Sequence, residues 1–130
     1  MQKDFDGWNS DKKEIEMFPT PAFYERGIWW CSIGVNVGDE EDGKMHQFER
    51  PVLILRKFNK QIAWVLPMST KHKNNDFYHN LEHDGVTFFV ILSQLRLISV
   101  KRFRRFMRKI SPHQFKQIQL KVIALIRISP

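Results

Sequence analysis

The residue types best suited to chemistry in this sequence are one arginine and a pair of neighbouring hydroxyl groups. Arg50 stands directly before Pro51 and a run of aliphatic residues, and Ser69 and Thr70 follow a second apolar segment. A guanidinium group binds a phosphate through two parallel hydrogen bonds and stabilises charge that develops on the phosphate oxygens. A hydroxyl group adds a hydrogen bond to the same phosphate. These groups suit phosphoryl transfer from an RNA 2′-hydroxyl, in which the substrate supplies its own nucleophile and the protein needs no metal ion.

A hairpin is the element that must bring these groups together. The apolar pattern predicts a strand over residues 51–58, a tight turn, and a returning strand over residues 61–66. In an antiparallel hairpin the start of one strand lies beside the end of the other. Arg50 is therefore predicted to lie beside Ser69 or Thr70 at one end of a sheet. The alternative is that Arg50 is a solvated charge at a strand end and that the hydroxyls belong to a turn.

Further short strands and one closing helix surround this hairpin. The helix is predicted from Ser111 to about Ile126, because Ser111 begins a capping box and apolar residues then recur every three or four positions. Ser99 is predicted to cap a short helical turn. Strands are expected over residues 27–33, 77–81, 86–92 and 95–98. Residues 104–110 fit either a strand or a helix, and we favour a strand. This pattern predicts a mainly β fold, a small curved sheet or barrel with a C-terminal helix.

The N-terminal end is predicted to be an appendage to that fold. Residues 1–20 are expected to form a short amphipathic helix, since Phe5, Trp8 and Ile15 fall near helical spacing, and prolines then end it. The apolar face of this helix is expected to dock on a single domain formed by residues 21–130.

Charge is divided unevenly along the 130 residues, whose formal net charge is +7. Residues 1–49 carry 5 Lys and Arg against 11 Asp and Glu, whereas residues 50–130 carry 16 against 3. A basic body of this kind indicates a polyanionic partner, because each neutralised phosphate releases counterions. The acidic residues at positions 39–42 lie in a polar, Gly-containing loop, which suggests a lid that competes with that partner.

Other classes of site find little support in the sequence. The five histidines are not spaced as in a zinc finger, no Gly-rich loop is followed by Lys-Ser or Lys-Thr, and no nucleophile elbow is present. We therefore predict neither a metal site nor a cofactor. The single cysteine, Cys31, excludes an intrachain disulfide. We expect no signal peptide and no membrane helix, because no apolar run approaches the roughly 20 residues that a span needs. The expected location is the cytoplasm.

The chain resembles the MazF/PemK family of toxin endoribonucleases, the mRNA interferases of type II toxin–antitoxin systems, over roughly residues 25–126. Several segments carry this resemblance in the family's order. They are Arg26-Gly27-Ile28-Trp29-Trp30, Gly38-Asp39-Glu40 with Gly43, Arg50-Pro51-Val52-Leu53-Ile54, Trp64-Val65-Leu66-Pro67-Met68-Ser69 and Ser93-Gln94-Leu95-Arg96-Leu97-Ile98. The chain departs from the family pattern at Ser69, where threonine is more common, at Ser93, where glutamate is usual, and in a longer loop before Arg50.

The resemblance implies an SH3-like barrel of the MazF/CcdB type with a C-terminal helix, usually as a homodimer. It implies metal-independent cleavage of single-stranded RNA to a 2′,3′-cyclic phosphate and a 5′-hydroxyl, and an antitoxin whose acidic tail blocks the groove. By the family's pattern, Arg50 acts in acid–base chemistry and stabilises the phosphate. Ser69 binds the phosphate, and Thr70 is the second candidate for that contact.

The remaining candidate residues are contacts to the substrate. They are Trp29, Gly38, Lys71, Lys73, Gln94 and Arg96. Trp29 or Trp30 can stack on a base, but successive strand residues face opposite sides, so at most one of them does. Gln94 and Arg96 either face the substrate or hold the barrel together. Two other functions stay open: a CcdB-like toxin that binds DNA gyrase, and a nucleic-acid-binding barrel without activity.

Overall fold

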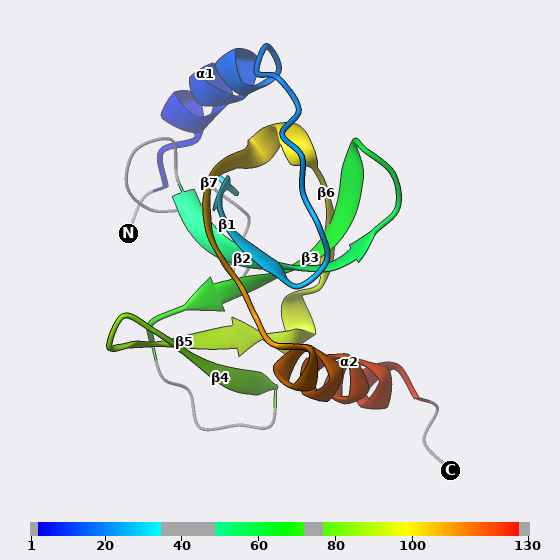
Figure 1. Cartoon of the computed structure of the whole chain (residues 1–130). Helices are drawn as coiled ribbons and strands as arrows, with labels where there is room; N and C mark the ends of the chain where they lie inside the picture. Colours follow the sequence, from blue (N-terminus) through cyan, green and yellow to red (C-terminus); the bar gives the residue numbers. More distant parts are fainter. Residues whose placement is uncertain (1–2, 35–48, 72–76, 128–130) are drawn as a thin grey trace.

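The computed structural model describes residues 3–34, 49–71 and 77–127. Within them the fold is mainly β, a strongly curled antiparallel sheet with a helix near each end of the chain (Figure 1). The helices are α1 (Phe5–Ile15) and α2 (Pro112–Ile126), the strands are β1 (Gly27–Ser32), β2 (Glu49–Lys57), β3 (Ile62–Ser69), β4 (Tyr78–His83), β5 (Val86–Ile91), β6 (Arg96–Ser99) and β7 (Phe103–Lys109), and the 3-10 turns are η2 (Leu92–Gln94) and η3 (Val100–Arg102).

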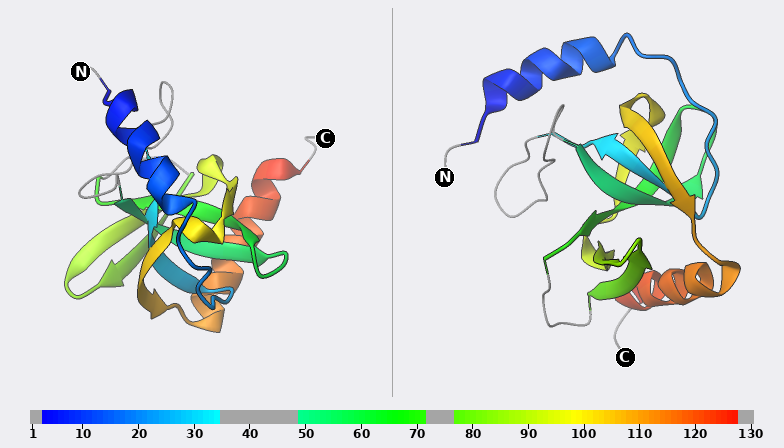
Figure 2. Two further views of the ribbon diagram at one scale, coloured as in Figure 1. Left: turned by 90° about the horizontal axis from the view of Figure 1, so that it is seen from above. Right: turned by 60° about the vertical axis from the view of Figure 1, so that its left-hand side comes forward.

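Strand β3 joins the two parts of the sheet. The strand order is β4-β5-β3-β2-β1-β7, and β6 also pairs with β3. The first part of β3 pairs with β2 and β6, whereas Met68 and Ser69 at its end pair with Val90 and Phe89 of β5. Figure 2 shows the resulting curl, with α1 and α2 at opposite ends of it. The expected mainly β fold with two helices is confirmed.

Two apolar clusters lie on the two faces of β2. Leu53 and Leu55 belong to the first cluster, which α2 covers with Phe115, Ile118 and Val122, while Val52 and Ile54 belong to the second. A strand that is buried on both faces reads as a continuous aliphatic run rather than as an alternating one. The run after Pro51 is therefore the sequence signature of the central strand, and its burial holds the start of β2 in place.

The observed elements follow most of the expected ones but differ at the hairpin. β2 begins at Glu49 rather than after Arg50, and β3 continues through Pro67 to Ser69 rather than ending at Leu66. Proline lacks the N–H that a ladder needs, and Pro67 is tolerated because β3 exchanges one partner strand for another just after it. Leu92 lies in η2 instead of in a strand.

Local capping signals predicted the other boundaries well. Ser99 accepts a hydrogen bond from the N–H of Lys101 at the start of η3, and Ser111 accepts one from the N–H of Gln114 at the start of α2. The predicted return bond of the capping box is replaced, because the Gln114 side chain instead contacts His79 of β4 at 2.7 Å. That contact joins α2 to the sheet.

Helix α1 docks on the body through part of its predicted apolar face. Trp8 and Ile15 are buried and pack with Phe18, whereas Phe5 is 51% exposed, so its expected place on the docked face is wrong. The guanidinium of Arg104 lies 3.8 Å from the centre of the Phe18 ring. Cation–π contacts of this kind hold the appendage against η3 and β7.

Candidate active site

One small cavity contains the arginine and the two hydroxyl groups that the sequence singles out. It has a volume of about 180 Å³ and is lined by Trp30, Glu49, Arg50, Pro51, Met68, Ser69, Thr70 and Phe88. The residues come from β1, β2, β5 and the end of β3, except Thr70, which directly follows β3. The structure therefore brings Arg50, Ser69 and Thr70 together at one end of the β2–β3 hairpin.

The cavity exists because β3 leaves β2 at this end of the sheet. The register of the two strands runs from Lys57 opposite Ala63 to Val52 opposite Pro67, after which β3 turns to β5. The Arg50 side chain lies at this junction, where its Nη1 donates to the Met68 carbonyl oxygen at 3.4 Å. A bonded and well-packed guanidinium loses little conformational freedom when it binds an anion.

Arg50 is more enclosed than a solvated strand-end charge would be. It is only 7% exposed, and it lies inside β2 rather than in front of it. Arginine stays protonated in proteins, so Arg50, itself largely buried, brings a permanent positive charge to the cavity. Electrostatic attraction for a phosphate is stronger there than in bulk water.

The hydroxyl of Ser69 is oriented by the backbone that follows it. Its Oγ accepts a hydrogen bond from the N–H of Lys71 at 3.1 Å, and the residue is 6% exposed. Because the oxygen accepts from the chain, the hydroxyl hydrogen is left to donate in another direction. Thr70 is exposed and lines the same cavity, and the exposed Lys71 follows it.

One charged residue of the cavity, Glu49, was not among the candidates derived from the sequence. Glu49 is 8% exposed, and its Oε2 accepts from Arg105 Nη2 at 2.8 Å. Arg105 in turn lies over the ring of Trp30, 5.1 Å from its centre. The available signal for Glu49 was its position directly before Arg50. Its partner Arg105 comes from β7, 56 residues later in the chain.

The two tryptophans of β1 face opposite sides of the sheet, as strand alternation requires. Trp29 is stacked on Phe103 with ring centres 5.5 Å apart, and it packs against the second apolar cluster. Trp30 lines the cavity. The structure therefore favours Trp30 over Trp29 as the ring that a substrate base can reach.

The other candidate contacts lie elsewhere or beyond the described residues. Gln94 is in η2 and Arg96 in β6, and both are half-buried outside the lining of the cavity. The positive charge of Arg96 opposes the raised pKa of the buried Cys31 thiol. Gly38, Lys73 and the acidic residues at positions 39–42 lie outside the described residues.

Cys31 and His79 have structural surroundings. Burial raises the pKa of the Cys31 thiol to about 12, in spite of the nearby positive charges of Arg102, Arg96 and Arg104, so the thiol is not a nucleophile at neutral pH. His79 Nε2 lies 2.7 Å from Gln114 Oε1, and its Nδ1 lies 2.9 Å from Lys121 Nζ. In the described part of the chain, no three His, Cys, Asp or Glu side chains lie close enough together to hold a metal ion.

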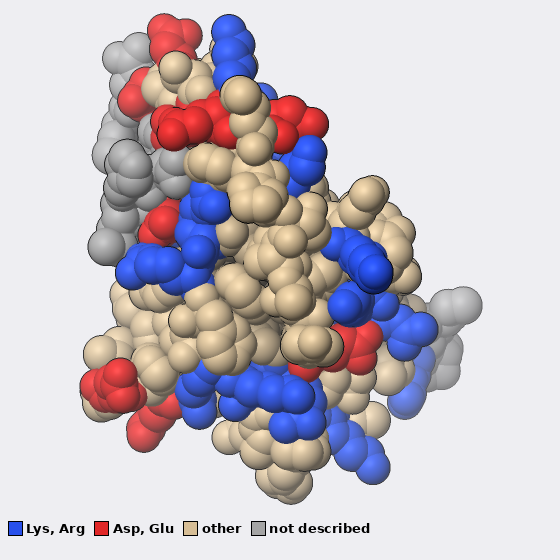
Figure 3. Space-filling view, turned by 45° about the horizontal axis from the view of Figure 1, so that its top comes forward, with Lys and Arg blue, Asp and Glu red and all other residues tan. Residues whose placement is uncertain are grey.

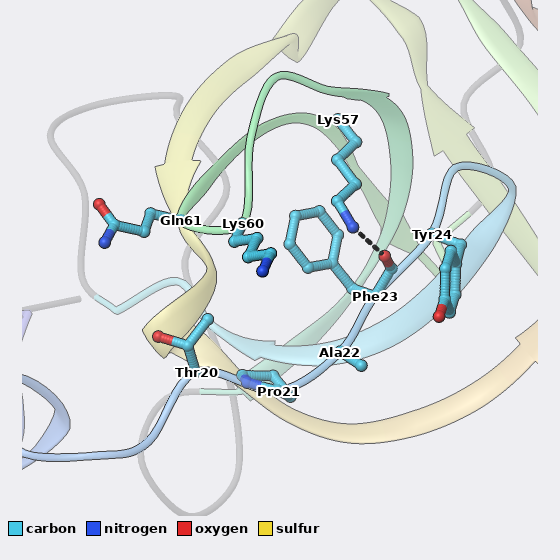
Figure 4. Close-up of a pocket in the computed structure, with 8 residues that line it drawn as sticks. All are labelled: Thr20, Pro21, Ala22, Phe23, Tyr24, Lys57, Lys60 and Gln61. Atoms are coloured by element: carbon cyan, nitrogen blue, oxygen red, sulfur yellow. Dashed lines mark hydrogen bonds between the residues drawn. The ribbon is translucent and has the colours of Figure 1, made fainter.

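A larger hollow lies at the opposite end of β2 (Figure 4). It measures about 530 Å³ and is lined by Thr20, Pro21, Ala22, Phe23, Tyr24, Lys57, Lys60 and Gln61. Lys57 Nζ donates to the Phe23 carbonyl oxygen at 3.0 Å and lies 4.6 Å from the centre of the Phe23 ring. These contacts hold the linker after α1 against the hairpin. The lining of this hollow contains none of Arg50, Ser69 and Thr70, so it is separate from the site of the predicted chemistry.

The surface charge agrees with the division seen in the sequence. In Figure 3 acidic side chains gather over the end of the molecule that carries α1, and basic side chains are spread over the body below it. Across residues 3–34, 49–71 and 77–127, no helix has the length and apolar character needed to cross a membrane.

Comparisons with known proteins place the chain beside one group of toxins. Residues 25–126 match the family model described as PemK-like, MazF-like toxin of type II toxin–antitoxin system. No curated protein sequence matches significantly.

Among solved structures, MazF from Deinococcus radiodurans has a TM-score of 0.64 at 16% identity, with 83% of this chain and 97% of that chain covered. A mycobacterial endoribonuclease in complex with its cognate antitoxin has a TM-score of 0.61 at 12% identity, covering 84% of this chain and 100% of the other. Mycobacterium tuberculosis toxin MazF-mt6 has a TM-score of 0.57 at 15% identity, covering 75% and 92%.

Proposed function

The chain belongs to the PemK-like, MazF-like family of toxins of type II toxin–antitoxin systems, and we propose that it is an endoribonuclease that cleaves single-stranded RNA. The observation that supports the proposal best is the buried Arg50 in one cavity with Ser69 and Thr70. Members of the family are endoribonucleases, and this cavity holds the groups that RNA phosphoryl transfer needs.

In the proposed reaction the RNA 2′-hydroxyl attacks the adjacent phosphorus, and a 2′,3′-cyclic phosphate and a 5′-hydroxyl result. Arg50 binds the phosphate and stabilises the charge on its oxygens in the transition state. Ser69 donates its hydroxyl hydrogen to a phosphate oxygen, and Thr70 provides a second hydroxyl at the open side. Protein groups supply all of these roles, so we propose that the reaction proceeds without a metal ion.

Substrate contacts around the cavity follow from its lining. Trp30 offers a ring for a base adjacent to the cleaved phosphate, and Lys71 offers a positive charge for the RNA backbone. Gly38 and Lys73 remain predicted contacts from the sequence resemblance.

We further propose two protein partners, an antitoxin and a second copy of the chain. One similar structure contains an endoribonuclease with its cognate antitoxin, and another contains MazE with MazF from Deinococcus radiodurans. The basic body of this chain, with 16 Lys and Arg against 3 Asp and Glu after residue 49, is suited to an acidic antitoxin segment. Homodimer formation follows from the family resemblance.

The decisive experiment is incubation of the purified protein with single-stranded RNA in the presence of EDTA, comparing wild type with Arg50→Ala. We expect wild type to produce cyclic-phosphate ends and Arg50→Ala to lose at least ~100-fold in rate, as loss of a transition-state contact predicts. Lys60→Ala, which removes an exposed positive charge from the opposite end of β2, is the matched control and should cleave normally. RNA binding without cleavage by the wild type would favour the inactive nucleic-acid-binding barrel.

A further inference from the structure

The cavity that contains Arg50 is also lined by an acidic residue. Glu49 lines the cavity, and its side chain is only 10% exposed. Burial of a carboxylate is costly unless it is paired, and here Arg105 contacts it at 2.8 Å. Glu49 is the one carboxylate of β2, and it is paired and largely buried directly beside Arg50.

The proposed reaction requires a group that accepts the proton of the 2′-hydroxyl. A guanidinium stays protonated in proteins, so the acid–base role that the resemblance implies for Arg50 does not include accepting this proton. The indole, pyrrolidine, thioether and phenyl groups of the lining have no basic atom, and the hydroxyls of Ser69 and Thr70 are weak bases. His79 lies outside the lining and is bound to Gln114 and Lys121. Among the described residues that line the cavity, Glu49 is therefore the one suitable proton acceptor.

We propose that Glu49 is a catalytic residue that accepts the 2′-hydroxyl proton, an inference that rests on the proposed RNA cleavage. As the proton passes to the carboxylate, the 2′-oxygen forms a bond to phosphorus. The bond from phosphorus to the 5′-oxygen then breaks, and this oxygen leaves with the bonding electrons and takes a proton from solvent. Glu49 afterwards releases its proton to solvent, so the protons balance over one turnover.

Arg105 and Trp30 hold the carboxylate in place. Trp30 and Arg105 are register partners in β1 and β7, and the Arg105 guanidinium lies over the Trp30 ring at 5.1 Å. The ion pair uses Oε2 of Glu49, and a carboxylate has lone pairs on both oxygens. Other groups near Glu49 are Arg50 on the same strand and the buried Cys31 thiol on β1, on whose pKa Glu49 acts. Arg105 is thus a positioning residue.

The test compares three variants of the full chain on the same single-stranded RNA. Glu49→Gln keeps the shape of the side chain but cannot accept the proton, and we expect a loss of ~100- to 10,000-fold in kcat with little change in RNA affinity. Arg105→Gln breaks the same ion pair but keeps the carboxylate, so its loss should be much smaller. Glu82→Gln, which removes an exposed carboxylate from β4, should leave cleavage unchanged.

A pH profile and chemical rescue separate proton transfer from a structural role. The wild-type rate should fall at acidic pH, where a carboxylate takes up a proton, and the Glu49→Gln profile should lack this limb. Added formate or acetate should restore part of the activity of Glu49→Ala, with the more basic carboxylate giving the faster rate. A carboxylate that only pairs with Arg105 would show no such dependence on basicity.

Each outcome bears on one of the two claims. If wild type and Arg50→Ala both fail to cleave RNA, the proposed function is wrong. If wild type cleaves, Arg50→Ala does not, and Glu49→Gln retains activity within about threefold, only the role of Glu49 is overturned. Equal losses in Glu49→Gln and Arg105→Gln, without rescue by formate, would also overturn it and assign both residues to structure.

Discussion

Trp8 of helix α1 lies directly against Gly34, two residues after the end of β1. Gly34 has φ +85°, and a Cβ built there would overlap the six-membered ring of Trp8. The glycine therefore has two functions at one position: it adopts a left-handed backbone conformation, and it leaves room for the indole. Helix α1 can dock closely because residue 34 has no side chain.

Replacement of Gly34 by alanine should destabilise the protein more than the backbone conformation alone explains. Gly85 provides the matched control, since its φ is +77° and a Cβ there would meet nothing within 4 Å. Gly85→Ala should cost about 1–2 kcal/mol for the left-handed backbone. Gly34→Ala should cost roughly 1–3 kcal/mol more, because the Trp8 ring must move. Urea unfolding of both variants measures the difference.

A double variant shows whether Trp8 causes the excess. In Trp8→Ala combined with Gly34→Ala, the penalty of the second substitution should fall to that of Gly85→Ala, because the overlapping ring is gone. Simple additivity of the two substitutions would show that the contact between Trp8 and Gly34 is not formed in solution.

The two hydroxyls of the cavity should contribute unequally to RNA cleavage. Ser69 is buried and its oxygen is held by the Lys71 N–H, whereas Thr70 is exposed. We expect Ser69→Ala to lower kcat/KM by ~10- to 100-fold, as for a hydrogen bond to a charged group of about 1.5–3 kcal/mol. Thr70→Ala should lose much less. Ser69→Thr keeps the hydroxyl and should retain most of the activity, and a larger loss in Thr70→Ala than in Ser69→Ala would contradict this ranking.

The hairpin at the centre of the fold was predictable because its signals are local. Asn59 Oδ1 accepts from the N–H groups of Gln61 and Ile62, and the aliphatic run of β2 is adjacent in the sequence. The neighbourhood of Arg50 and Ser69 followed from hairpin geometry alone. The exchange of β3 from β2 to β5 was not predictable, because it depends on pairing of Met68 and Ser69 with the distant residues Val90 and Phe89.

The same distinction explains which site residues were missed. Glu49 acquires its position from Arg105, which only the folded sheet brings near it. The choice between Trp29 and Trp30 likewise required knowledge of which face of β1 meets the cavity. Strand alternation requires the two rings to point to opposite faces, but it does not say which face carries the chemistry.

Protonation of His79 should destabilise the protein below neutral pH. Burial lowers its pKa from the ordinary value of 6.5, and the charge of Lys121 lowers it further, while the hydrogen bond to Gln114 opposes the shift. The unfolded chain therefore binds a proton at this residue more readily than the folded protein. Stability from His79 is present above pH 6.5 and is lost as the pH falls from 6.5 through the lowered pKa of the folded state.

The variant His79→Gln isolates this contribution because it removes the titrating ring. Urea midpoints of wild type should fall between pH 7.5 and pH 5 by more than those of His79→Gln. His113→Gln, which replaces an exposed histidine on α2, should retain the wild-type dependence. Because His79 joins β4 to α2 through Gln114 and Lys121, the acid-induced loss should appear first as reduced amide protection in α2. Identical pH dependence in wild type and His79→Gln would show that the ring does not remain neutral in the folded protein.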